Sequence, residues 1–391
     1  MPAHAVIIGG GIAGLAAATA LQHRSWHVTI LEREPTPAEV GAGITLWPNA
    51  LRALDALGVG SLIRSRGLTQ AAGGIRSSSG RWLARTDTAA LAARFGDGIV
   101  VLERGDLLSA LVDACTDADM HTSTEVVGVD ADGTVRYTTP SGADATITAD
   151  VVIGADGLRS AARRSLWPES TVRTTGMLAA RLVGDVADPV HDAGGETWGR
   201  GDYAGVAPMP DGRVYAYLVA PVSAAIPSEP DAGLRWWQHR FAGWHHPIPQ
   251  LLAGADARQV LRNELYELAP LPSLVEGRVA LLGDAGHAMT PNLGQGACQA
   301  LEDAVELAAV LPVDADVGPR LREFNRRRLP RVHMIARRSG IAGMAAASSG
   351  RIATALRNTI MRATPAGVAL RGLDSVIGWT PPDSTSDPKE C

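Results

Sequence analysis

A glycine motif near the start of the chain constrains its fold most strongly. Residues 6–8 are apolar and lead into a G-x-G-x-x-G pattern at residues 9–14, which an Ala/Leu-rich stretch follows. A second apolar run, residues 28–31, ends on Glu32. This order predicts a strand, a glycine turn, a helix, a second strand and an acid, the arrangement that binds an adenine dinucleotide. The alternative is a glycine-rich turn between strand and helix that binds no ligand.

Each part of this motif has a mechanical role. Gly9 permits the tight turn, Gly11 lets the backbone approach a pyrophosphate, and Gly14 lets the helix pack closely on the strand. The helix that starts around Ala13 offers free N–H groups and the positive end of its dipole to phosphates. Glu32 can accept hydrogen bonds from a ribose diol. We therefore predict that these five residues contact the cofactor.

The bulk composition excludes several classes of protein. A chain of 391 residues favours two domains, and a net charge of −5 argues against general binding to nucleic acids or anionic membranes. Cys115, Cys298 and Cys391 form no C-x-x-C pair, which fits a reducing cytosol and excludes a dithiol redox centre of that spacing. No apolar run is long enough for a membrane span, and the N-terminus lacks the basic leader of a signal peptide. We expect a cytoplasmic protein without a metal site.

A single G-x-G-x-x-G motif indicates which dinucleotide stays bound. A pyridine-nucleotide disulfide reductase would carry a second such motif and a redox-active disulfide, and this sequence has neither. The resident dinucleotide is therefore expected to be FAD rather than NAD.

Two further motifs point to a family. Residues 150–160 read D-V-V-I-G-A-D-G-L-R-S, and residues 283–296 read G-D-A-G-H-A-M-T-P-N-L-G-Q-G, followed by Glu302 and Asp303. Together with the glycine motif they resemble the single-component FAD aromatic hydroxylases, the p-hydroxybenzoate hydroxylase-like group A flavoprotein monooxygenases. The resemblance covers most of residues 1–335 and is closest to short members such as salicylate, 3-hydroxybenzoate and urate hydroxylases.

The resemblance implies a set of cofactor contacts beyond the glycine motif. Glu32 and Arg33 would hold the adenosine ribose, and the backbone of Val126 would face the adenine. The other implied cofactor-binding residues are Gly43, Arg104 at the phosphates or ribityl chain, Asp156 near both FAD and NADPH, Asp284 at the ribityl hydroxyls, and Ala297. Asp284 also follows a predicted parallel strand, where ligands bind in open α/β sheets.

Gly294 and Gly296 carry a physical argument of their own. Glycines at the N-terminus of the helix predicted for residues 295–311 would let a flavin ring approach backbone N–H groups. The positive end of the helix dipole would then favour the anionic reduced flavin. The resemblance places Pro291 as a wall of the pocket near the flavin C4a position, and it gives His287 a supporting role in the loop, with a catalytic base as the alternative.

The predicted fold class is α/β, α+β overall. It comprises a Rossmann-type FAD-binding domain with a parallel sheet, a β-sheet substrate domain and C-terminal helices. The predicted FAD-binding domain is discontinuous, and residues 68–100 look aperiodic. The expected boundaries are 1–70, 98–170 and 269–315 for the FAD-binding domain, 71–97 and 171–268 for the substrate domain, 316–380 for the helices and 381–391 for a tail.

Substrate contacts are expected from the second domain. Arg181 and Tyr217 lie on predicted strands, and Tyr215 shares a face with Tyr217 because side chains alternate along a strand. In this fold that sheet covers the flavin, so Arg181 could bind a carboxylate or phenolate and Tyr217 could polarise a phenol. Packing is the alternative for both. The eight arginines of residues 320–338 predict a solvated helix face rather than a phosphate or partner site.

The activity that the resemblance implies is an NAD(P)H- and O2-dependent monooxygenation. NADPH or NADH would reduce the FAD, and O2 would form a flavin C4a-hydroperoxide. That group would hydroxylate or epoxidise an aromatic or other electron-rich small molecule. The alternatives are a related FAD reductase or oxidase without oxygen insertion, and a flavin-binding sensor without turnover. No nucleic-acid partner is expected, and both a monomer and a homodimer remain open.

Overall fold

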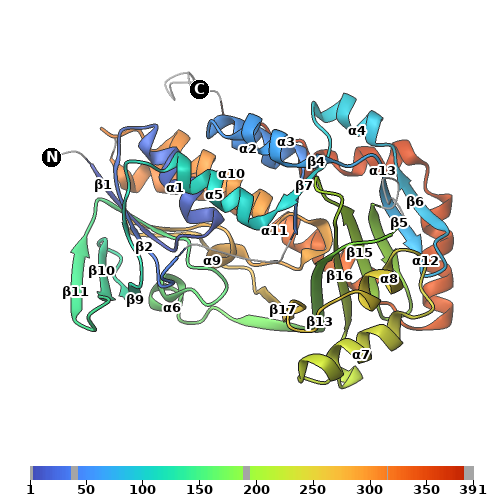
Figure 1. Ribbon diagram of the computed structural model, residues 1–391. Coiled ribbons are helices and arrows are strands. Elements are labelled where there is room, and N and C mark those ends of the chain that lie inside the picture. Colours follow the sequence, from blue (N-terminus) through green and yellow to red (C-terminus); the bar gives the residue numbers. More distant parts are fainter. Residues whose placement is uncertain (1–2, 37–42, 188–193, 315, 383–391) are drawn as a thin grey trace.

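The computed structural model describes residues 3–36, 43–187, 194–314 and 316–382, so most of the predicted tail lies outside it. The described residues form two large sheets, two small sheets and a set of helices around them (Figure 1). Most of the helices lie on one side of the six-stranded sheet and along one edge of the molecule (Figure 1).

A six-stranded sheet forms the nucleotide-binding half. Its strands in spatial order are β18 (Val275–Glu276), β19 (Val279–Leu281), β12 (Val151–Gly154), β1 (His4–Ile8), β2 (His27–Leu31) and β8 (Asp119–His121). All neighbours are parallel except β18, which pairs antiparallel with β19. The central strands are continuous apolar runs because both faces of the sheet are covered. The order reverses around β1, which creates the crevice where such sheets bind ligands.

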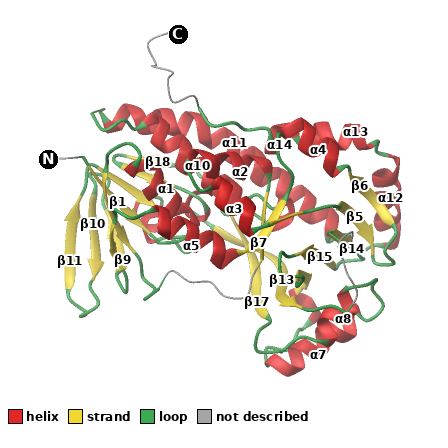
Figure 2. Ribbon diagram, turned by 45° about the horizontal axis from the view of Figure 1, so that its top comes forward, coloured by secondary structure: helices red, strands yellow, loops and turns green. Residues whose placement is uncertain are grey.

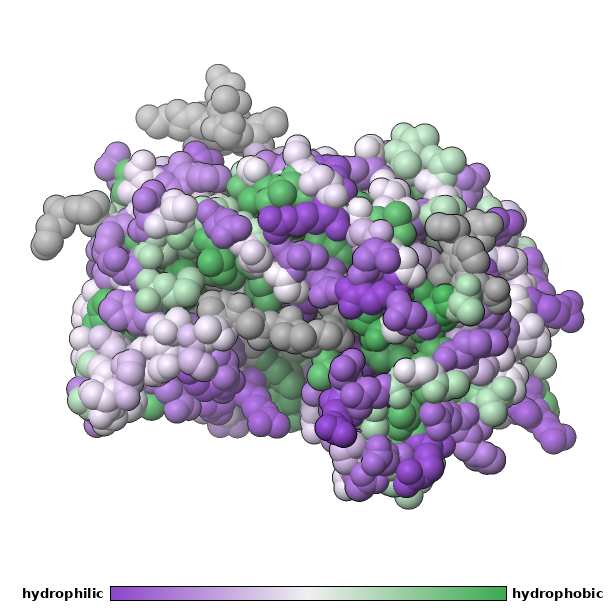
Figure 3. Space-filling view, viewed as in Figure 1, coloured by the Kyte–Doolittle hydropathy of each residue, from purple (hydrophilic) through white to green (hydrophobic). Residues whose placement is uncertain are grey.

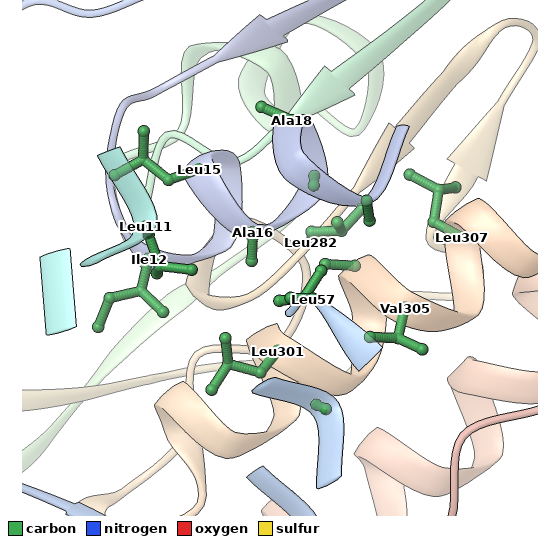
Figure 4. Close-up of a cluster of buried hydrophobic side chains, with 14 of the residues drawn as sticks. Ile12, Leu15, Ala16, Ala18, Leu57, Leu111, Leu282, Leu301, Val305 and Leu307 are labelled. Atoms are coloured by element: carbon green, nitrogen blue, oxygen red, sulfur yellow. The ribbon is translucent and has the colours of Figure 1, made fainter. Parts of the chain in front are cut away.

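Helices cover one face of this sheet. They are α1 (Ile12–Gln22), α2 (Pro48–Ala56), α3 (Gly60–Arg66), α5 (Arg104–Ala114) and α10 (Gly296–Val310). In Figure 4 side chains of α1 and α10 gather with Leu57 and Leu282 in one apolar cluster. The run of small residues in α1 lets α10 pack closely against it, so the two glycine-rich helix starts lie at the same edge of the sheet.

The other face of the sheet carries a small antiparallel sheet and a short helix. The strands β9 (Glu125–Val129), β10 (Thr134–Thr138) and β11 (Asp144–Thr148) form the meander at the left of Figure 2, and α6 (Ala161–Leu166) packs beside them. A third, three-stranded sheet joins β3 (Gly43–Leu46), β7 (Val100–Glu103) and β4 (Leu68–Thr69).

The second large sheet has seven strands. In spatial order they are β17 (Leu261–Leu268), β13 (Val172–Gly184), β16 (Val214–Pro221), β15 (Tyr203–Pro208), β14 (Gly195–Trp198), β5 (Gly73–Ser77) and β6 (Trp82–Thr86). The expectation that residues 68–100 lack periodic structure was wrong. They form β4, β5, β6 and helix α4 (Thr88–Phe95), and their short strands gain order by pairing with distant ones, as β5 does with β14.

Two groups of helices cover this sheet. The apolar residues of α7 (Pro230–Phe241) and α8 (Ile248–Ala253) pack on one face. On the other face lie the end of α11 (Val317–Ala346) and part of α12 (Arg351–Ala363). The shorter α13 (Ala366–Gly372) and α14 (Asp374–Ile377) follow. Among the described residues, no helix is both long and apolar enough to cross a membrane.

The 30-residue helix α11 connects the two halves. At 1.5 Å per residue it is about 45 Å long. Its first half packs into the core of the six-stranded sheet through Leu321 and Phe324, and its last turn packs on the seven-stranded sheet through Ala346. On the side shown in Figure 3 the surface between the two halves is recessed, and hydrophobic residues line this recess.

Candidate functional site

The carboxyl ends of four parallel strands lie at one edge of the six-stranded sheet. Backbone hydrogen bonds join them in a row: Gly9 N–H donates to Leu31 O at 2.9 Å, Ala155 N–H to Ile8 O at 2.9 Å, and Leu282 N–H to Gly154 O at 3.0 Å. The three sequence motifs follow directly after these strands. The fold therefore brings the motifs together at the crevice where α/β sheets hold ligands.

The glycine loop at the start of α1 is shaped by close backbone contacts. Gly9 has a φ of +104°, and a Cβ at Gly14 would lie 1.9 Å from the carbonyl oxygen of Gly9. A side chain at Gly14 would therefore force helix and strand apart. A Cβ at Gly11, by contrast, would meet no protein atom within 4 Å. The space beside Gly11 is open next to the N-terminus of α1, which suits the approach of a pyrophosphate.

Glu32 anchors this loop from the end of β2. Its Oε2 accepts a hydrogen bond from Gly10 N–H at 2.5 Å, and its Oε1 accepts one from Glu34 N–H at 2.7 Å. Arg33 is exposed and its guanidinium contacts Glu34 at 3.2 Å. The carbonyl of Glu32 accepts from Thr124 N–H, which brings the start of β9, and with it the buried Val126, beside the acid.

We expect Glu32→Gln to weaken FAD binding by about 1–3 kcal/mol, because a charge-assisted hydrogen bond to the ribose is lost. The amide group also presents a donor where the carboxylate accepts from two backbone N–H groups, so the loop itself is loosened. Flavin fluorescence titration of the apoprotein measures the affinity, with Glu34→Gln, the same substitution at an exposed neighbouring glutamate, as the control. An unchanged dissociation constant for Glu32→Gln would place the ribose elsewhere.

Asp156 lies next to the glycine loop. Its Oδ2 accepts hydrogen bonds from Ala161 N–H at 2.6 Å and Ala162 N–H at 3.2 Å, which caps α6. Its Oδ1 is buried and has no partner in the described part of the chain. The Asp156 Cα lies 3.1 Å from the position that a Cβ of Gly9 would take. A buried carboxylate oxygen without a partner beside this loop fits a hydroxyl donor of the bound cofactor.

Asp284 is exposed and opens the short helix α9 (Asp284–His287) directly after β19. Gly283, the residue before Asp284, packs against both α1 and α10. A Cβ on Gly283 would lie 3.1 Å from the Cβ of Ala13 and 3.2 Å from that of Ala300. Asp284 thus projects from the same edge as the glycine loop, where its carboxylate is free to accept hydrogen bonds from sugar or ribityl hydroxyls.

A buried network holds the Asp284 loop in place. Asp303 of α10 accepts hydrogen bonds from Gly283 N–H at 2.9 Å and from His287 Nε2–H at 2.6 Å. Its other oxygen accepts from Arg328 Nε–H at 2.7 Å, while Arg328 Nη1–H donates to Glu302 at 2.6 Å. His287 is buried and bonded to Asp303, which is the supporting role expected of it.

Arg328 corrects the expectation of a solvated arginine face on α11. Its side chain and those of Glu302 and Asp303 are fully buried, whereas Arg326 on the same helix is largely exposed. Burial acts to raise the pKa of Asp303, but the charges of His287 and Arg328 outweigh it, and the net shift is downward. The position of Arg328 along α11 does not by itself reveal that it is buried, because its partners Glu302 and Asp303 lie on α10.

The N-terminus of α10 offers hydrogen-bond donors to a ligand. Trp47 Nε1 and Gln295 Nε2 are buried and lack an acceptor among the residues that the structure describes. Trp47 Nε1 lies 2.9 Å from the position that a Cβ of Gly294 would take, and the space around a Cβ at Gly296 is open. Ala297 packs on the core at the first turn. Buried donors at the positive end of a helix suit an acceptor-rich ring such as a flavin.

The seven-stranded sheet meets the small β3–β7–β4 sheet at Tyr215. A Cβ at Gly43 would lie 2.5 Å from the Tyr215 ring, and Gly43 pairs with Glu103, the residue before Arg104. Burial raises the pKa of Tyr215, and the charges of Arg181 and Arg104 act in the opposite direction. Gly43, Arg104, Arg181 and Tyr215 are therefore neighbours, although they come from four separate segments.

Tyr217 is bonded to a residue that sequence reasoning missed. Its hydroxyl donates to Glu196 Oε1 on β14, and Glu196 Oε2 accepts from Trp198 Nε1–H at 2.8 Å. Burial raises the pKa of Glu196 and raises that of Tyr217 well above its ordinary value. The sequence offered one signal for Glu196: it is the only acid in the short strand Gly195–Trp198, whose other residues are apolar or small. Its partner Tyr217 could not be inferred from the spacing.

A second tyrosine links this cluster to the loop before α10. Tyr203 of β15 hydrogen-bonds Asn292, and burial raises the pKa of Tyr203 to about 12. Asn292 follows the exposed Pro291 in the 3-10 turn η2 (Pro291–Leu293). Pro291, the tyrosines and the α10 N-terminus therefore lie in one region, whereas Glu32, Arg33 and Val126 lie at the other end of the glycine loop.

Comparisons with known proteins agree with this arrangement. The chain is 35% identical over 329 residues to the aurachin C monooxygenase/isomerase of Stigmatella aurantiaca, covering 84% of this chain and 85% of that protein. It is 34% identical over 369 residues to the 2-heptyl-3-hydroxy-4(1H)-quinolone synthase of Pseudomonas aeruginosa, covering 92% of this chain and 94% of that protein.

A solved structure extends the likeness to the whole fold. The Klebsiella pneumoniae HpxO complexed with FAD and uric acid superposes with a TM-score of 0.86 at 28% identity, covering 96% of each chain. The model of the FAD binding domain family matches residues 3–339, which include all three motifs. The protein therefore belongs to the FAD binding domain family and is a flavoenzyme of its hydroxylase and monooxygenase group, with FAD as cofactor.

Proposed function

We propose that this enzyme uses NADPH or NADH and O2 to hydroxylate a small aromatic substrate that carries a ring hydroxyl. The observation that carries the proposal is the half-buried Tyr217–Glu196 pair, which adjoins Tyr203 and through it the loop before α10. The curated relatives support an aromatic substrate, since their names include a urate hydroxylase, a 3-hydroxybenzoate 6-hydroxylase and a quinolone synthase.

The residues divide into two sets in this proposal. The glycine loop with Gly9, Gly11, Ala13 and Gly14 and the residues Glu32, Arg33, Gly43, Arg104, Val126, Asp156, Asp284, Gly294, Gly296 and Ala297 hold FAD. Arg181, Tyr217 and Pro291 face the substrate. When bound, FAD supplies electron transfer and the activation of O2. The protein orients the ring, excludes water and controls the proton of the substrate hydroxyl.

The hydrogen bond to Glu196 decides what Tyr217 can do. Because the Tyr217 proton is donated to Glu196, the phenol oxygen presents only lone pairs to a ligand. It therefore accepts a hydrogen bond from the substrate hydroxyl, and this draws the substrate towards its electron-rich phenolate form. Arg181, close to Tyr215, supplies a positive charge that stabilises a phenolate or a carboxylate.

The direct test measures cofactor oxidation with a panel of hydroxylated aromatics. We expect FAD to be released on acid precipitation, and NADPH or NADH oxidation to be stimulated by one group of ring hydroxyl compounds, with one oxygen atom incorporated from O2. The panel includes hydroxybenzoates, hydroxyquinolones and purines. If these compounds stimulate NAD(P)H oxidation but the only product is H2O2, the result would support the oxidase alternative instead.

Tyr217→Phe should slow product formation by roughly threefold to tenfold, since one hydrogen bond is worth about 0.5–1.5 kcal/mol. A poorly held substrate also raises the H2O2 formed per NAD(P)H consumed. Coupling efficiency is measured as product over NAD(P)H, beside Glu196→Gln, Arg181→Ala and wild type, with FAD content as the control. Unchanged rate and coupling in Tyr217→Phe and Arg181→Ala would show that these residues serve packing.

A further inference from the structure

Helix α12 presents an apolar face that no described residue covers. Ile352, Leu356 and Ile360 recur every four residues and are 86%, 59% and 57% exposed. This spacing places them along one stripe of the helix. Leu356 and Ile360 also line a groove of about 480 Å³ whose other walls include Trp198 and Met361. Figure 1 shows α12 at the end of the molecule opposite the small meander β9–β11.

The charged residues of α12 and α13 are all arginines, namely Arg351, Arg357, Arg362 and Arg371. Residues 324–373 contain ten arginines and no acidic residue, so this segment carries +10 while the rest of the chain carries −15. Some of these arginines are paired, as Arg328 is. Arg351, Arg362 and Arg371 are exposed and make no ion pair within the described residues.

The positions of the arginines on α12 match those of a helix that lies flat on a surface. At 100° per residue, Arg351 and Arg362 fall together about 120–140° from Leu356 at the middle of the stripe, and Arg357 falls about 100° from it on the other side. Arg357 stacks over the Trp198 ring at 5.3 Å and donates to backbone carbonyls, so it borders the groove rather than closing it. Apolar side chains on one face and cations on the remaining, polar face are the pattern of an interfacial helix.

We propose that α12, with the adjoining α13, docks on an anionic lipid surface, with the stripe among the acyl chains and the arginines at the head groups. A basic amphipathic helix gains from both burial of apolar area and attraction to anionic lipids. The net charge of −5 argued against such binding. That value is a sum over the whole chain, in which residues 324–373 are basic and the remaining residues carry the excess of negative charge.

Other occupants of the face fit the charges less well. A second copy meeting this face through a two-fold axis would bring the two sets of arginines together, which is unfavourable. The C-terminal residues 383–391 are Asp-Ser-Thr-Ser-Asp-Pro-Lys-Glu-Cys, which offer no large apolar side chain to cover the stripe. Lipid supplies both the apolar phase and the negative charge.

The test is vesicle flotation of the FAD-loaded protein. Phosphatidylcholine vesicles that contain phosphatidylglycerol should carry the protein up the gradient, whereas pure phosphatidylcholine vesicles should not, and high salt should release it. Arg351→Gln, Arg362→Gln and Arg371→Gln together should weaken binding on the order of a hundredfold, since each arginine near the surface contributes about fivefold. Replacing Ile352, Leu356 and Ile360 by Ser should weaken it by tenfold or more.

Matched substitutions elsewhere separate docking from general effects. Val127→Ser removes an equally exposed apolar side chain, and Arg173→Gln, Arg235→Gln and Arg258→Gln remove exposed charges outside the segment. These controls should bind vesicles like wild type, and every variant should keep its FAD content and melting temperature. No flotation of wild type, or equal flotation of the stripe variant, overturns the proposal. The proposal is also overturned if the wild-type protein is a dimer and the stripe variant is a monomer, because the stripe would then be a dimer interface.

Discussion

Arg328→Met is expected to lower the free energy of unfolding by about 3–5 kcal/mol, because it removes the buried cation that Glu302 and Asp303 share. Among the described residues, Glu302 is then left with Arg331 alone and Asp303 with His287 alone as ion-pair partners. Arg328 is fully buried and bonds both Glu302 and Asp303 at 2.6 and 2.7 Å. Methionine fills much of the volume but cannot donate a hydrogen bond. The melting temperature should fall by roughly 4–6 °C, and FAD should be held less firmly because Asp303 supports the Asp284 loop.

Thermal unfolding of the holoprotein measures this effect, with Arg326→Gln as the control on the same helix. Arg326 pairs with Glu323 at the surface, where such a pair contributes at most about 1 kcal/mol. A melting temperature of Arg328→Met within a degree of the control would contradict the argument.

The same variant has a predicted pH dependence. The pKa of Asp303 is lowered in the folded protein, so its contribution to stability is present above the ordinary pKa of an aspartate and is lost as the pH falls through the lowered value. In the variant the Asp303 carboxylate loses the charge of Arg328 that lowers its pKa, so it is protonated at a higher pH, which relieves the cost of burying its charge. The stability difference between wild type and Arg328→Met should therefore narrow on acidification, as urea unfolding at a series of pH values would show.

Gly14→Ala should weaken FAD binding on the order of a hundredfold or more, which corresponds to about 2.7 kcal/mol. The added Cβ would lie 1.9 Å from Gly9 O and 3.2 Å from Ile7 Cγ2, so the loop and α1 must separate. That movement displaces the N–H groups that face the pyrophosphate, and the branched Gly14→Val should be worse. Flavin titration of the apoprotein gives the affinity, and circular dichroism checks that the fold persists.

Gly11→Ala provides the informative comparison for this prediction. Its Cβ meets no protein atom within 4 Å, so the stability of the apoprotein should not change. If the pyrophosphate fills that space, FAD affinity should nevertheless fall. Wild-type affinity in both Gly11→Ala and Gly14→Ala would mean that the dinucleotide lies elsewhere.

The dinucleotide half was predictable because its signals are local. A strand, three glycines at fixed spacing, a helix and a terminal acid lie within residues 4–32. The close contacts of Gly14 and the bond from Gly10 N–H to Glu32 are made inside that unit, whereas Gly9 also meets Ala155 and Asp156. The helix at residues 296–310 was likewise predictable from its apolar periodicity. Residues 68–100 were misjudged because β5 and β6 are short and gain their order from β14, more than a hundred residues away.

The sequence by itself therefore determined the nucleotide-binding half and the flavoenzyme family, because both depend on short spacings that act through the backbone. Only the tertiary structure decided the partner of Tyr217, the burial of Arg328 and the exposure of the α12 stripe. Glu196 is 21 residues from Tyr217, and Glu302 is 26 from Arg328. Whether such side chains meet, and whether an apolar face is covered, depends on how distant segments pack, which no local pattern records.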